Sequence, residues 1–411
     1  MSKLLETATN TSPEFAIHFQ PHGAILLDRK SMFYFRLSGR GTELALMLAK
    51  NNSVQKTARI WEILSKEKVS EEELNNELDS HPFTSAWKKG LLNHPLMITG
   101  STEYYLPISC TLQLTNMCNL KCPFCYASSG KPYPDELSSS QWIKVLQKLA
   151  SHGVADITIT GGEAKLTKNF LKIIATASSL FTNVNLFSNG LNWRDDEIEL
   201  ISYLGNVSVQ ISIDGNSSTH DKLRGREGGF SESLKNAERF AQSSVPVLIA
   251  MTVNQLNYKE VYEVIEKSVD VGAVVFRAGQ TIPVGRASEY QDMTSEMKEK
   301  VKQQLADAKK RWSDQIIIID WEDHHQNDSL TDFCTPGFLS WYIRADGQVT
   351  PCQIEDTSLG HVLKNSMQEI GSPERLMQAK RLAKQCRCIG KIELPEADLP
   401  FTIQKEAEVK P

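Results

Sequence analysis

The stretch Cys118-Asn119-Leu120-Lys121-Cys122-Pro123-Phe124-Cys125 places three thiols on one short loop, just after an apolar run. Thiolates at this density bind soft metals, so zinc and an iron–sulfur cluster are the candidate occupants. A structural zinc ion needs a fourth nearby ligand, but the chain from there to Ala155 holds no cysteine and only His152. Three buried core cysteines fit poorly with the lysine, asparagine and proline among them. The pattern therefore favours a [4Fe–4S] cluster with one iron left open for a small molecule.

Length and charge limit the class of protein. The chain has 411 residues, which predicts two or three domains. A net charge of −5 argues against a nucleic-acid partner, which needs a clustered basic face. No apolar run approaches the ~20 residues of a membrane span, and residues 1–13 lack a signal pattern. We therefore expect a cytoplasmic protein without a membrane partner. Its eight cysteines are not expected to form disulfides, and their clustering indicates metal binding.

The region 1–100 is predicted to be a small winged-helix-like domain. Short strands are expected at 15–19, 24–28 and 32–37, followed by three amphipathic helices, the last starting at a capping box on Ser70. Winged helices often bind DNA, but this one has no dense basic face. The domain could instead be a purely structural cap on the barrel, without a binding function. His94, Pro95 and Gly100 are expected to mark a linker.

From Pro107 to about residue 310 a repeating strand–helix pattern predicts a parallel α/β barrel or part of one. The cysteine loop follows the first strand, at the end where barrel active sites lie. Six strands favour a partial, TIM-like (β/α)6 barrel over a closed barrel of eight. The predicted strands are 108–114, 156–160, 183–187, 207–213, 247–253 and 274–278.

Polar residues and glycines follow several of these strands. Each motif alone is typical of an ordinary turn. Their order after the cysteine loop, each at or near a strand end, instead favours a site for a small molecule. The candidate residues at these strand ends are Gly161, Gly162, Glu163, Ser188, Asn189 and Asp214.

A C-terminal module is predicted over 311–411, opened by a buried strand at 316–320 and containing a hairpin at 341–350. Four more cysteines lie in it, Cys334, Cys352, Cys386 and Cys388, and they are candidate ligands of zinc or of a second cluster. Zinc sites usually show pairs with two residues between the cysteines, whereas the close pair here is separated by one. Unligated thiols are the third possibility. Cys110, on the first strand, is predicted to be a small buried core residue.

The cysteine loop, with Phe124 just before its last thiol, resembles the cluster-binding loop of the radical S-adenosylmethionine (SAM) superfamily. Over its whole length the chain resembles the peptide-modifying branch of that superfamily, and in particular the sactisynthases that mature bacteriocins and killing factors. The resemblance implies that Cys118, Cys122 and Cys125 hold a [4Fe–4S] cluster whose open iron binds SAM. Electron transfer from the cluster into SAM then yields a 5′-deoxyadenosyl radical that abstracts hydrogen.

The resemblance also implies roles around SAM. Gly161, Gly162 and Glu163 match the strand end that meets the methionyl amine, although the family usually has proline where this chain has Ala164. Ser188 and Asn189 match the polar pair that meets the ribose and carboxylate, and Ser212 and Asp214 match the next strand end. Arg224 resembles the arginine that pairs with the SAM carboxylate. The segment 283–287 resembles a segment that recurs in peptide-modifying members.

For the flanking regions, the resemblance implies two further functions. The N-terminal domain is expected to bind the leader of a ribosomal precursor peptide as an added strand, with 32–37 as the receiving edge. The four C-terminal cysteines are expected to form a twitch/SPASM-like module with a second cluster, [2Fe–2S] favoured and [4Fe–4S] possible. If all four are ligands, that cluster accepts an electron or is structural. An external flavodoxin-like or ferredoxin-like donor is implied as well.

The implied reaction is a thioether bond between a peptide cysteine sulfur and the α-carbon of an acceptor residue, made by an oxidoreductase. Within the class, carbon–carbon crosslinking and epimerisation are alternatives, and epimerisation would be favoured if Cys110 reached the barrel interior. Outside the class, the alternative is a non-catalytic iron–sulfur scaffold or DNA-binding sensor.

Overall fold

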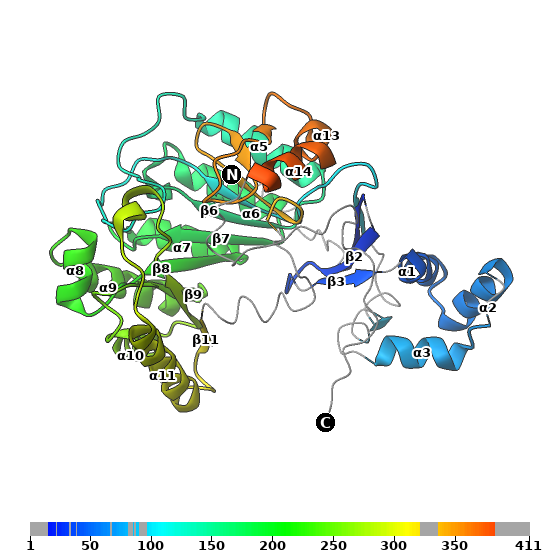
Figure 1. The fold of residues 1–411 in the computed structure, drawn as a ribbon, viewed down its shortest axis with the longest axis horizontal. Helices are drawn as coiled ribbons and strands as arrows, with labels where there is room; N and C mark the ends of the chain where they lie inside the picture. Colours follow the sequence, from blue (N-terminus) through cyan, green and yellow to red (C-terminus); the bar gives the residue numbers. More distant parts are fainter. Residues whose placement is uncertain are drawn as a thin grey trace. The chain divides into compact units, whose positions relative to one another are not determined.

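A computed structural model describes residues 15–21, 23–32, 34–37, 39–65, 68–80, 85, 88–89, 97–320 and 336–382. The chain forms two compact units, each described by itself (Figure 1). Of the described residues, the first comprises those up to Ile108 with Gly371–Pro373, and the second comprises Ser109–Ile370 with Glu374–Leu382.

The first unit is built on a four-stranded sheet with the order β3-β2-β1-β4. The three strands β1, β2 and β3 pair antiparallel, as their sequence patterns predict, and β3 lies at an edge as expected for 32–37. The expected linker is wrong at Gly100, because 97–100 forms β4 and pairs in parallel with β1. His94 and Pro95 lie outside the described residues. The strands are β1 Phe15–Gln20, β2 Gly23–Asp28, β3 Tyr34–Leu37 and β4 Met97–Gly100.

Three helices follow the hairpins of this unit. Ser70 forms the predicted capping box with Glu73 at the start of the third helix. Ala45 and Leu48 of the first helix pack against the apolar face of the sheet. Trp61 and Leu74 join the second and third helices in a separate apolar cluster. The helices are α1 Gly39–Asn51, α2 Val54–Ser65 and α3 Glu71–Asp79.

The second unit contains the predicted run of six parallel strands in consecutive order, which confirms the partial barrel. The sheet is nevertheless longer than expected. β11 adds in parallel to β10 at one edge, and β12 adds in parallel to β5 at the other, followed by β13 and β14. The six strands are β5 Ser109–Gln113, β6 Asp156–Thr160, β7 Asn183–Ser188, β8 Val207–Ser212, β9 Val247–Val253 and β10 Val275–Gln280. The added strands are β11 Ile317–Ile319, β12 Ser340–Ile343, β13 Gln348–Thr350 and β14 Gly360–His361.

Two expectations for the C-terminal module are therefore corrected. The strand at 316–320 also extends the barrel sheet, because it pairs with β10, and it is not fully buried, since Ile317 is 64% exposed. The predicted hairpin is present as β12 and β13, but its first strand also belongs to the barrel sheet. Sequence patterns show each strand but not its long-range partner.

The helices that connect the strands lie on one side of the sheet (Figure 1). Residues along β8 and β9 accordingly alternate between fully buried and half-buried. Among the described residues, no helix is long and apolar enough to span a membrane. The helices are α5 Ser139–Ser151, α6 Phe170–Leu180, α7 Asp195–Leu204, α8 Ser217–Arg224, α9 Gly229–Gln242, α10 Val261–Asp270, α11 Ser295–Arg311, α13 Met367–Ile370 and α14 Pro373–Leu382, with short 3₁₀ turns η2 Ala164–Leu166 and η3 Gly285–Glu289.

Candidate active site

The cysteine loop leaves the carboxyl end of β5 and is tied at both of its ends. The Cys118 N–H donates to the Gly130 carbonyl at 3.1 Å, and the Gly130 N–H donates to the Asn116 carbonyl at 2.9 Å. The Glu136 carboxylate accepts from the Asn116 N–H at 2.6 Å and from the Thr115 hydroxyl at 2.7 Å. These bonds fix where the loop starts and ends. Sequence reasoning missed Glu136, which no motif marks.

The three thiols share an apolar environment. Cys122 is buried and Cys118 and Cys125 are half-buried, and all three contact a cluster that includes Leu120 and Phe124. Burial raises the pKa of Cys118 to about 11 and also raises the pKa of Cys122. Metal binding requires thiolates, so loading this site with metal would release protons.

A hydrogen bond reaches one of the sulfurs directly, since the Leu120 N–H donates to Cys118 Sγ at 3.4 Å. Among the residues that the structure describes, no three histidine, cysteine or carboxylate side chains converge as the ligands of a metal ion do.

The glycine turn after β6 lies directly against the start of the cysteine loop. The Gly162 N–H donates to the Thr115 carbonyl at 2.7 Å, and the Glu163 N–H donates to the Met117 carbonyl at 2.8 Å. A Cβ at Gly162 would lie 2.4 Å from the Met117 oxygen, and one at Gly161 would lie 2.9 Å from the Thr115 oxygen. Only glycine allows this approach. The structure thus brings two of the predicted motifs together.

Glu163 connects the turn to the end of β7. Its carboxylate is buried and accepts from the Ser188 hydroxyl at 2.9 Å and from the Asn189 N–H at 2.8 Å. Burial raises the pKa of Glu163, and these two hydrogen bonds oppose the rise. The Asn189 amide donates in turn to Asn119 Oδ1 at 2.7 Å, within the cysteine loop. Glu163, Ser188 and Asn189 therefore form one network with the loop.

Asp214 and Arg224 form a buried ion pair just after β8. Arg224 Nε and Nη2 each lie 2.5 Å from Asp214 Oδ2. The Asp214 side chain also accepts from the Thr252 N–H at 2.8 Å. Burial by itself would lower the pKa of Arg224, but the charge of Asp214 raises it, and the net shift is upward. Arg224 also lies over the ring of Phe124, 5.6 Å from its centre, so this pair borders the cysteine loop.

The other residues singled out in the sequence lie partly outside the described part of the chain. Ser212 is the last residue of β8 and is half-buried. Cys352 is half-buried and follows β13, whereas Cys334, Cys386 and Cys388 lie outside the described residues. Their grouping stays a prediction. Cys110 is 1% exposed on β5, and burial raises the pKa of its thiol, in agreement with a core residue.

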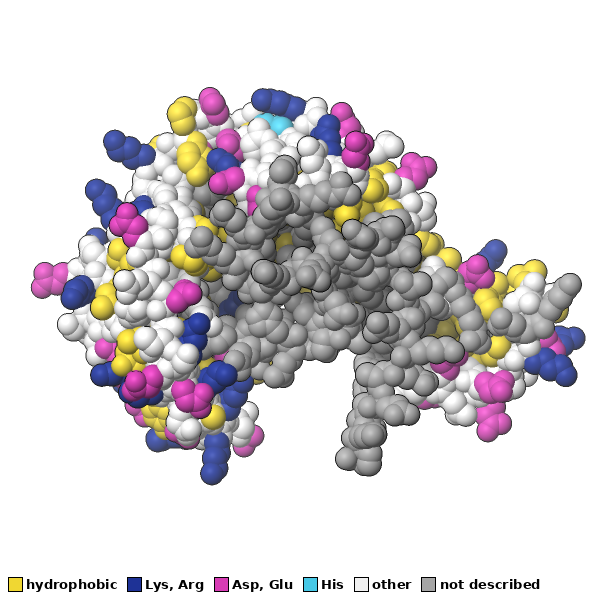
Figure 2. All heavy atoms as spheres, in the orientation of Figure 1, with side chains coloured by type: hydrophobic (Ala, Val, Ile, Leu, Met, Phe, Trp, Pro, Cys, Tyr) yellow, Lys and Arg dark blue, Asp and Glu magenta, His cyan; other side chains and the backbone are white. Residues whose placement is uncertain are grey.

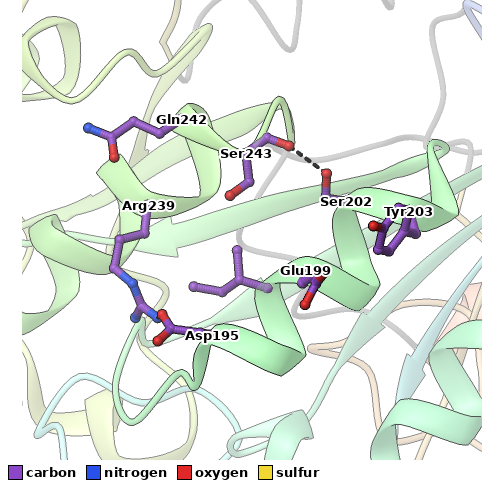
Figure 3. A pocket seen from close by; sticks show the side chains of 8 residues that line it. Asp195, Glu199, Ser202, Tyr203, Arg239, Gln242 and Ser243 are labelled. Carbon is purple, nitrogen blue, oxygen red and sulfur yellow. Dashed lines mark hydrogen bonds and ion pairs between the residues drawn. The ribbon is translucent and has the colours of Figure 1, made fainter.

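A separate open cavity of about 490 Å³ lies between α7 and α9 (Figure 3). Arg239 and Asp195 form an ion pair at its wall, and the Ser202 hydroxyl donates to the Ser243 carbonyl at 2.6 Å. The cavity is lined by helix residues on the outside of the barrel, not by the carboxyl ends of the strands. It is therefore not part of the cysteine site.

Charges on the visible face of the molecule are mixed. Figure 2 shows lysine and arginine interspersed with aspartate and glutamate over the described residues, without one large basic area.

Two family models match the chain. Residues 112–267 match the radical SAM superfamily, and this range contains the cysteine loop and the motifs after β6, β7 and β8. Residues 334–389 match the iron–sulfur cluster-binding domain named SPASM, and this range contains all four C-terminal cysteines. The second match supports an iron–sulfur cluster over zinc or unligated thiols.

Relatives and solved structures agree with these matches. The sporulation killing factor maturation protein SkfB of Bacillus subtilis is 62% identical over 397 residues, 96% of either chain. The antilisterial bacteriocin subtilosin biosynthesis protein AlbA of Bacillus subtilis is 30% identical over 307 residues, 71% of this chain and 67% of AlbA. The crystal structure of Streptococcus suis SuiB bound to S-adenosylmethionine has a TM-score of 0.68 at 14% identity, covers 90% of this chain and 89% of SuiB, and shows the shared fold. The resemblance noted in the sequence is confirmed: this chain belongs to the radical SAM superfamily, in the family of SkfB, and carries a C-terminal iron–sulfur cluster-binding domain.

Proposed function

We propose that this protein is a sactisynthase that matures a ribosomally made peptide. It would join a peptide cysteine sulfur to the α-carbon of an acceptor residue. The observation that carries the proposal is the 62% identity to a killing factor maturation protein over 96% of the chain, together with the thiol loop at the barrel mouth. AlbA, another relative, is named for the biosynthesis of a bacteriocin.

The thiol loop fits the cofactors of the superfamily. Cys118, Cys122 and Cys125 would hold a [4Fe–4S] cluster, and three thiols leave one iron for the amino and carboxylate groups of SAM. When bound, the two cofactors together supply a carbon radical that removes a hydrogen atom from the peptide. The residues around SAM would be Gly161, Gly162, Glu163, Ser188, Asn189, Ser212, Asp214 and Arg224.

The protein residues orient and shield this site. Ser188 and Asn189 fix the Glu163 carboxylate, which would accept a hydrogen bond from the methionyl amine. Asp214 fixes the side chain of Arg224, whose guanidinium would meet the SAM carboxylate. The apolar cluster around Phe124 buries Cys122 and leaves Cys118 and Cys125 half-buried, so it limits the access of water to the thiols. Each of these effects can be tested by substitution.

Thioether formation removes the α-hydrogen, the thiol proton and one further electron from the peptide. Cys334, Cys352, Cys386 and Cys388 would hold the acceptor for that electron, a second cluster for which we favour [2Fe–2S] over [4Fe–4S]. The SPASM match over these cysteines supports a cluster there without specifying its type. A reduced flavodoxin or ferredoxin would supply the electron that starts the reaction, in the reducing cytoplasm.

The N-terminal region, 1–100, would bind the leader of the precursor peptide. Its edge strand β3 presents main-chain groups to which an extended peptide can add as a further strand. SuiB, which shares the fold, has been solved bound to the precursor peptide SuiA. We propose the barrel at 101–310 and the cluster module at 311–411 as the other two functional regions.

Mass spectrometry of a precursor peptide after anaerobic reaction tests the chemistry. We expect loss of two hydrogen atoms per bridge, with the cysteine thiol no longer open to alkylation. Loss of two hydrogens with the thiol still alkylated would indicate a carbon–carbon crosslink, and an unchanged mass with an inverted α-carbon would indicate epimerisation. Failure to cleave SAM under reducing conditions would indicate a non-catalytic iron–sulfur protein.

A further inference from the structure

The segment that follows β10 reaches the cysteine loop, which follows β5. Four strands separate β10 from β5 in the sheet order. The two ends of the six-stranded partial barrel are thus joined at the mouth by a contact that no strand pairing provides. The contact is made by the turn η3 and centres on Arg286.

Arg286 donates three hydrogen bonds to carbonyls of the cysteine loop. Its Nε donates to the Cys122 carbonyl at 2.8 Å, its Nη1 to the Ser129 carbonyl at 2.6 Å, and its backbone N–H to the Cys125 carbonyl at 3.0 Å. The planar guanidinium holds its donors in a fixed geometry, so the two side-chain bonds set the spacing between these carbonyls. Two of the three acceptors belong to cysteines of the thiol site.

The neighbours of Arg286 make this approach possible. Gly285 has a φ of +60°, and a Cβ there would lie 2.1 Å from the Tyr126 carbonyl oxygen. Ala287 is completely buried in the same apolar cluster as Phe124, and Tyr290 packs against it. The turn is therefore built to lie flat against the loop.

The ends and the apex of the cysteine loop are held by different hydrogen bonds. The bonds between Cys118, Gly130 and Asn116 fix its ends, and Asn116 Oδ1 also accepts from the Ser129 hydroxyl at 3.2 Å. The other backbone bonds of the stretch from Cys122 to Ser129 are local turns, from the Cys125 N–H to the Cys122 carbonyl at 3.4 Å and from the Ser128 N–H to the Cys125 carbonyl at 3.2 Å. Arg286 binds that stretch at three points. Burial raises the pKa of Cys122, and the nearby charges of Arg224 and Arg286 oppose the rise.

We infer that Arg286 is a positioning residue of the radical SAM site, which fastens the apex of the cysteine loop and sets the spacing of Cys122 and Cys125 for the cluster. Nothing in the cysteine motif itself specifies this residue. The inference rests on the proposed function, because it assumes that the three cysteines hold a cluster. It concerns the retention and electronic state of that cluster, so it can be tested without turnover.

The test compares full-length proteins reconstituted anaerobically with iron and sulfide. The variants are Arg286→Gln and Arg286→Lys, and the matched control is Arg311→Gln, which removes the same charge from an exposed position on α11. Two quantities are measured: the rate of iron release to a chelator, and the change that added SAM causes in the electron paramagnetic resonance spectrum of the reduced protein. The SAM-dependent change identifies the cluster at the three-cysteine loop.

For Arg286→Gln we expect iron release from the SAM-responsive cluster to accelerate about 10-fold or more, the usual effect of losing a residue that orients metal ligands. The spectral response to SAM should weaken in parallel. Arg286→Lys should behave more like the glutamine variant than like the parent, since one ammonium cannot span both carbonyls. Arg311→Gln should leave both measurements unchanged.

Gly285→Ala provides a second route that removes no charge. It should reproduce the faster iron release, because the added Cβ pushes the turn away from Tyr126. Far-UV circular dichroism of each apoprotein checks that the variants fold. If Arg286→Gln does not fold, the Gly285→Ala protein is used for the test in its place.

Parent-like iron release and spectra in Arg286→Gln would overturn the inference, as would full retention in Arg286→Lys. A parent protein whose cluster does not respond to SAM would instead overturn the proposed function. The two failures are therefore distinguishable.

Discussion

Glu163 is a buried carboxylate whose position is explained by its partners more than by its own strand. Both of its oxygens accept hydrogen bonds, from Ser188 and from the Asn189 N–H, and Asn189 continues the network to Asn119. A glutamine has one oxygen and one donor group, so it can keep only one of the two bonds.

We predict that Glu163→Gln weakens SAM binding by about 10-fold or more, because a neutral amide replaces the carboxylate that would accept from the charged methionyl amine, a hydrogen bond of about 1.5–3 kcal/mol. Equilibrium dialysis of reconstituted protein with labelled SAM measures the affinity. Glu199→Gln, an exposed position on α7, is the matched control and should bind as the parent does. Equal affinities for all three proteins would refute the assigned position of Glu163 beside SAM.

His18 is the second buried polar residue with a specific consequence. It is fully buried in the first unit, where Nδ1 contacts the Thr99 hydroxyl at 2.9 Å and Nε2 contacts the Leu106 carbonyl at 2.8 Å. Burial lowers the pKa of His18 from 6.5 to about 4, against the opposing effect of the Leu106 bond. The neutral ring accepts from Thr99 and donates to Leu106.

We predict that the first unit loses stability as the pH falls from about 6.5 toward 4, by about 3 kcal/mol in total. The sign follows because the unfolded chain binds a proton that the folded unit excludes. Hydrogen exchange at β1 amides, corrected for the intrinsic rate, measures the loss. His18→Gln should flatten this pH dependence while His152→Gln should not, and an equally steep loss in His18→Gln would contradict the prediction.

At the scale of elements, the turn between β6 and η2 shows how a strand end supports the cysteine loop. Gly161 and Gly162 are needed because backbone oxygens of 115 and 117 lie within 3 Å of where a Cβ would be. These oxygens belong to the chain that leads into the thiols. A side chain at either glycine would have to displace the segment 115–117, because its neighbours there are backbone atoms, which cannot turn aside as a flexible side chain can.

We predict that Gly162→Ala destabilises the second unit by about 1–3 kcal/mol, the range for overpacking a tight contact. Gly130→Ala is the control, because a Cβ there would meet nothing within 4 Å. The midpoint of thermal unfolding of the apoprotein measures the difference. If Gly162→Ala is as stable as Gly130→Ala, the prediction is wrong, and the turn accommodates a Cβ without a cost in stability.

The added strands illustrate which element properties are local. The apolar run at 316–320 and the hairpin at 341–350 are visible in the sequence, and both form strands. Their pairing with β10 and β5 is not visible, because an edge strand offers its hydrogen bonds to any extended segment of suitable polarity. Which segment pairs with each edge strand is decided by the tertiary structure.

At the scale of the whole molecule, the two sets of cysteines lie in different matched regions, 112–267 and 334–389. Their proposed tasks also differ, since one set would serve SAM and the other would accept an electron. The loss of one set should therefore leave the chemistry of the other intact.

We predict that Cys352→Ala lowers the iron content of the reconstituted protein and abolishes thioether formation, while reductive SAM cleavage continues at a comparable rate. Iron analysis, peptide mass spectrometry and chromatography of the cleaved nucleoside measure the three quantities. Cys110→Ala, a buried thiol outside both sets, should retain iron and activity. Unimpaired thioether formation in Cys352→Ala would remove the electron-accepting role from the C-terminal cysteines.

The sequence by itself determined the local features of this protein. The six-strand barrel, the Ser70 helix start and the order of the polar strand ends follow from periodicity and capping, which act over a few residues. The spacing of Cys118, Cys122 and Cys125 likewise indicated a cluster from thiol chemistry alone.

The tertiary structure decided what those features contact. Glu163 contacts Ser188 and Asn189, and Arg224 pairs with Asp214. Glu136 and Arg286 bind the cysteine loop, and β11 and β12 join the barrel sheet. The reason is physical: capping and periodicity need only neighbouring residues, whereas a buried carboxylate or guanidinium is satisfied by whichever donors and acceptors the folded backbone brings within about 3 Å.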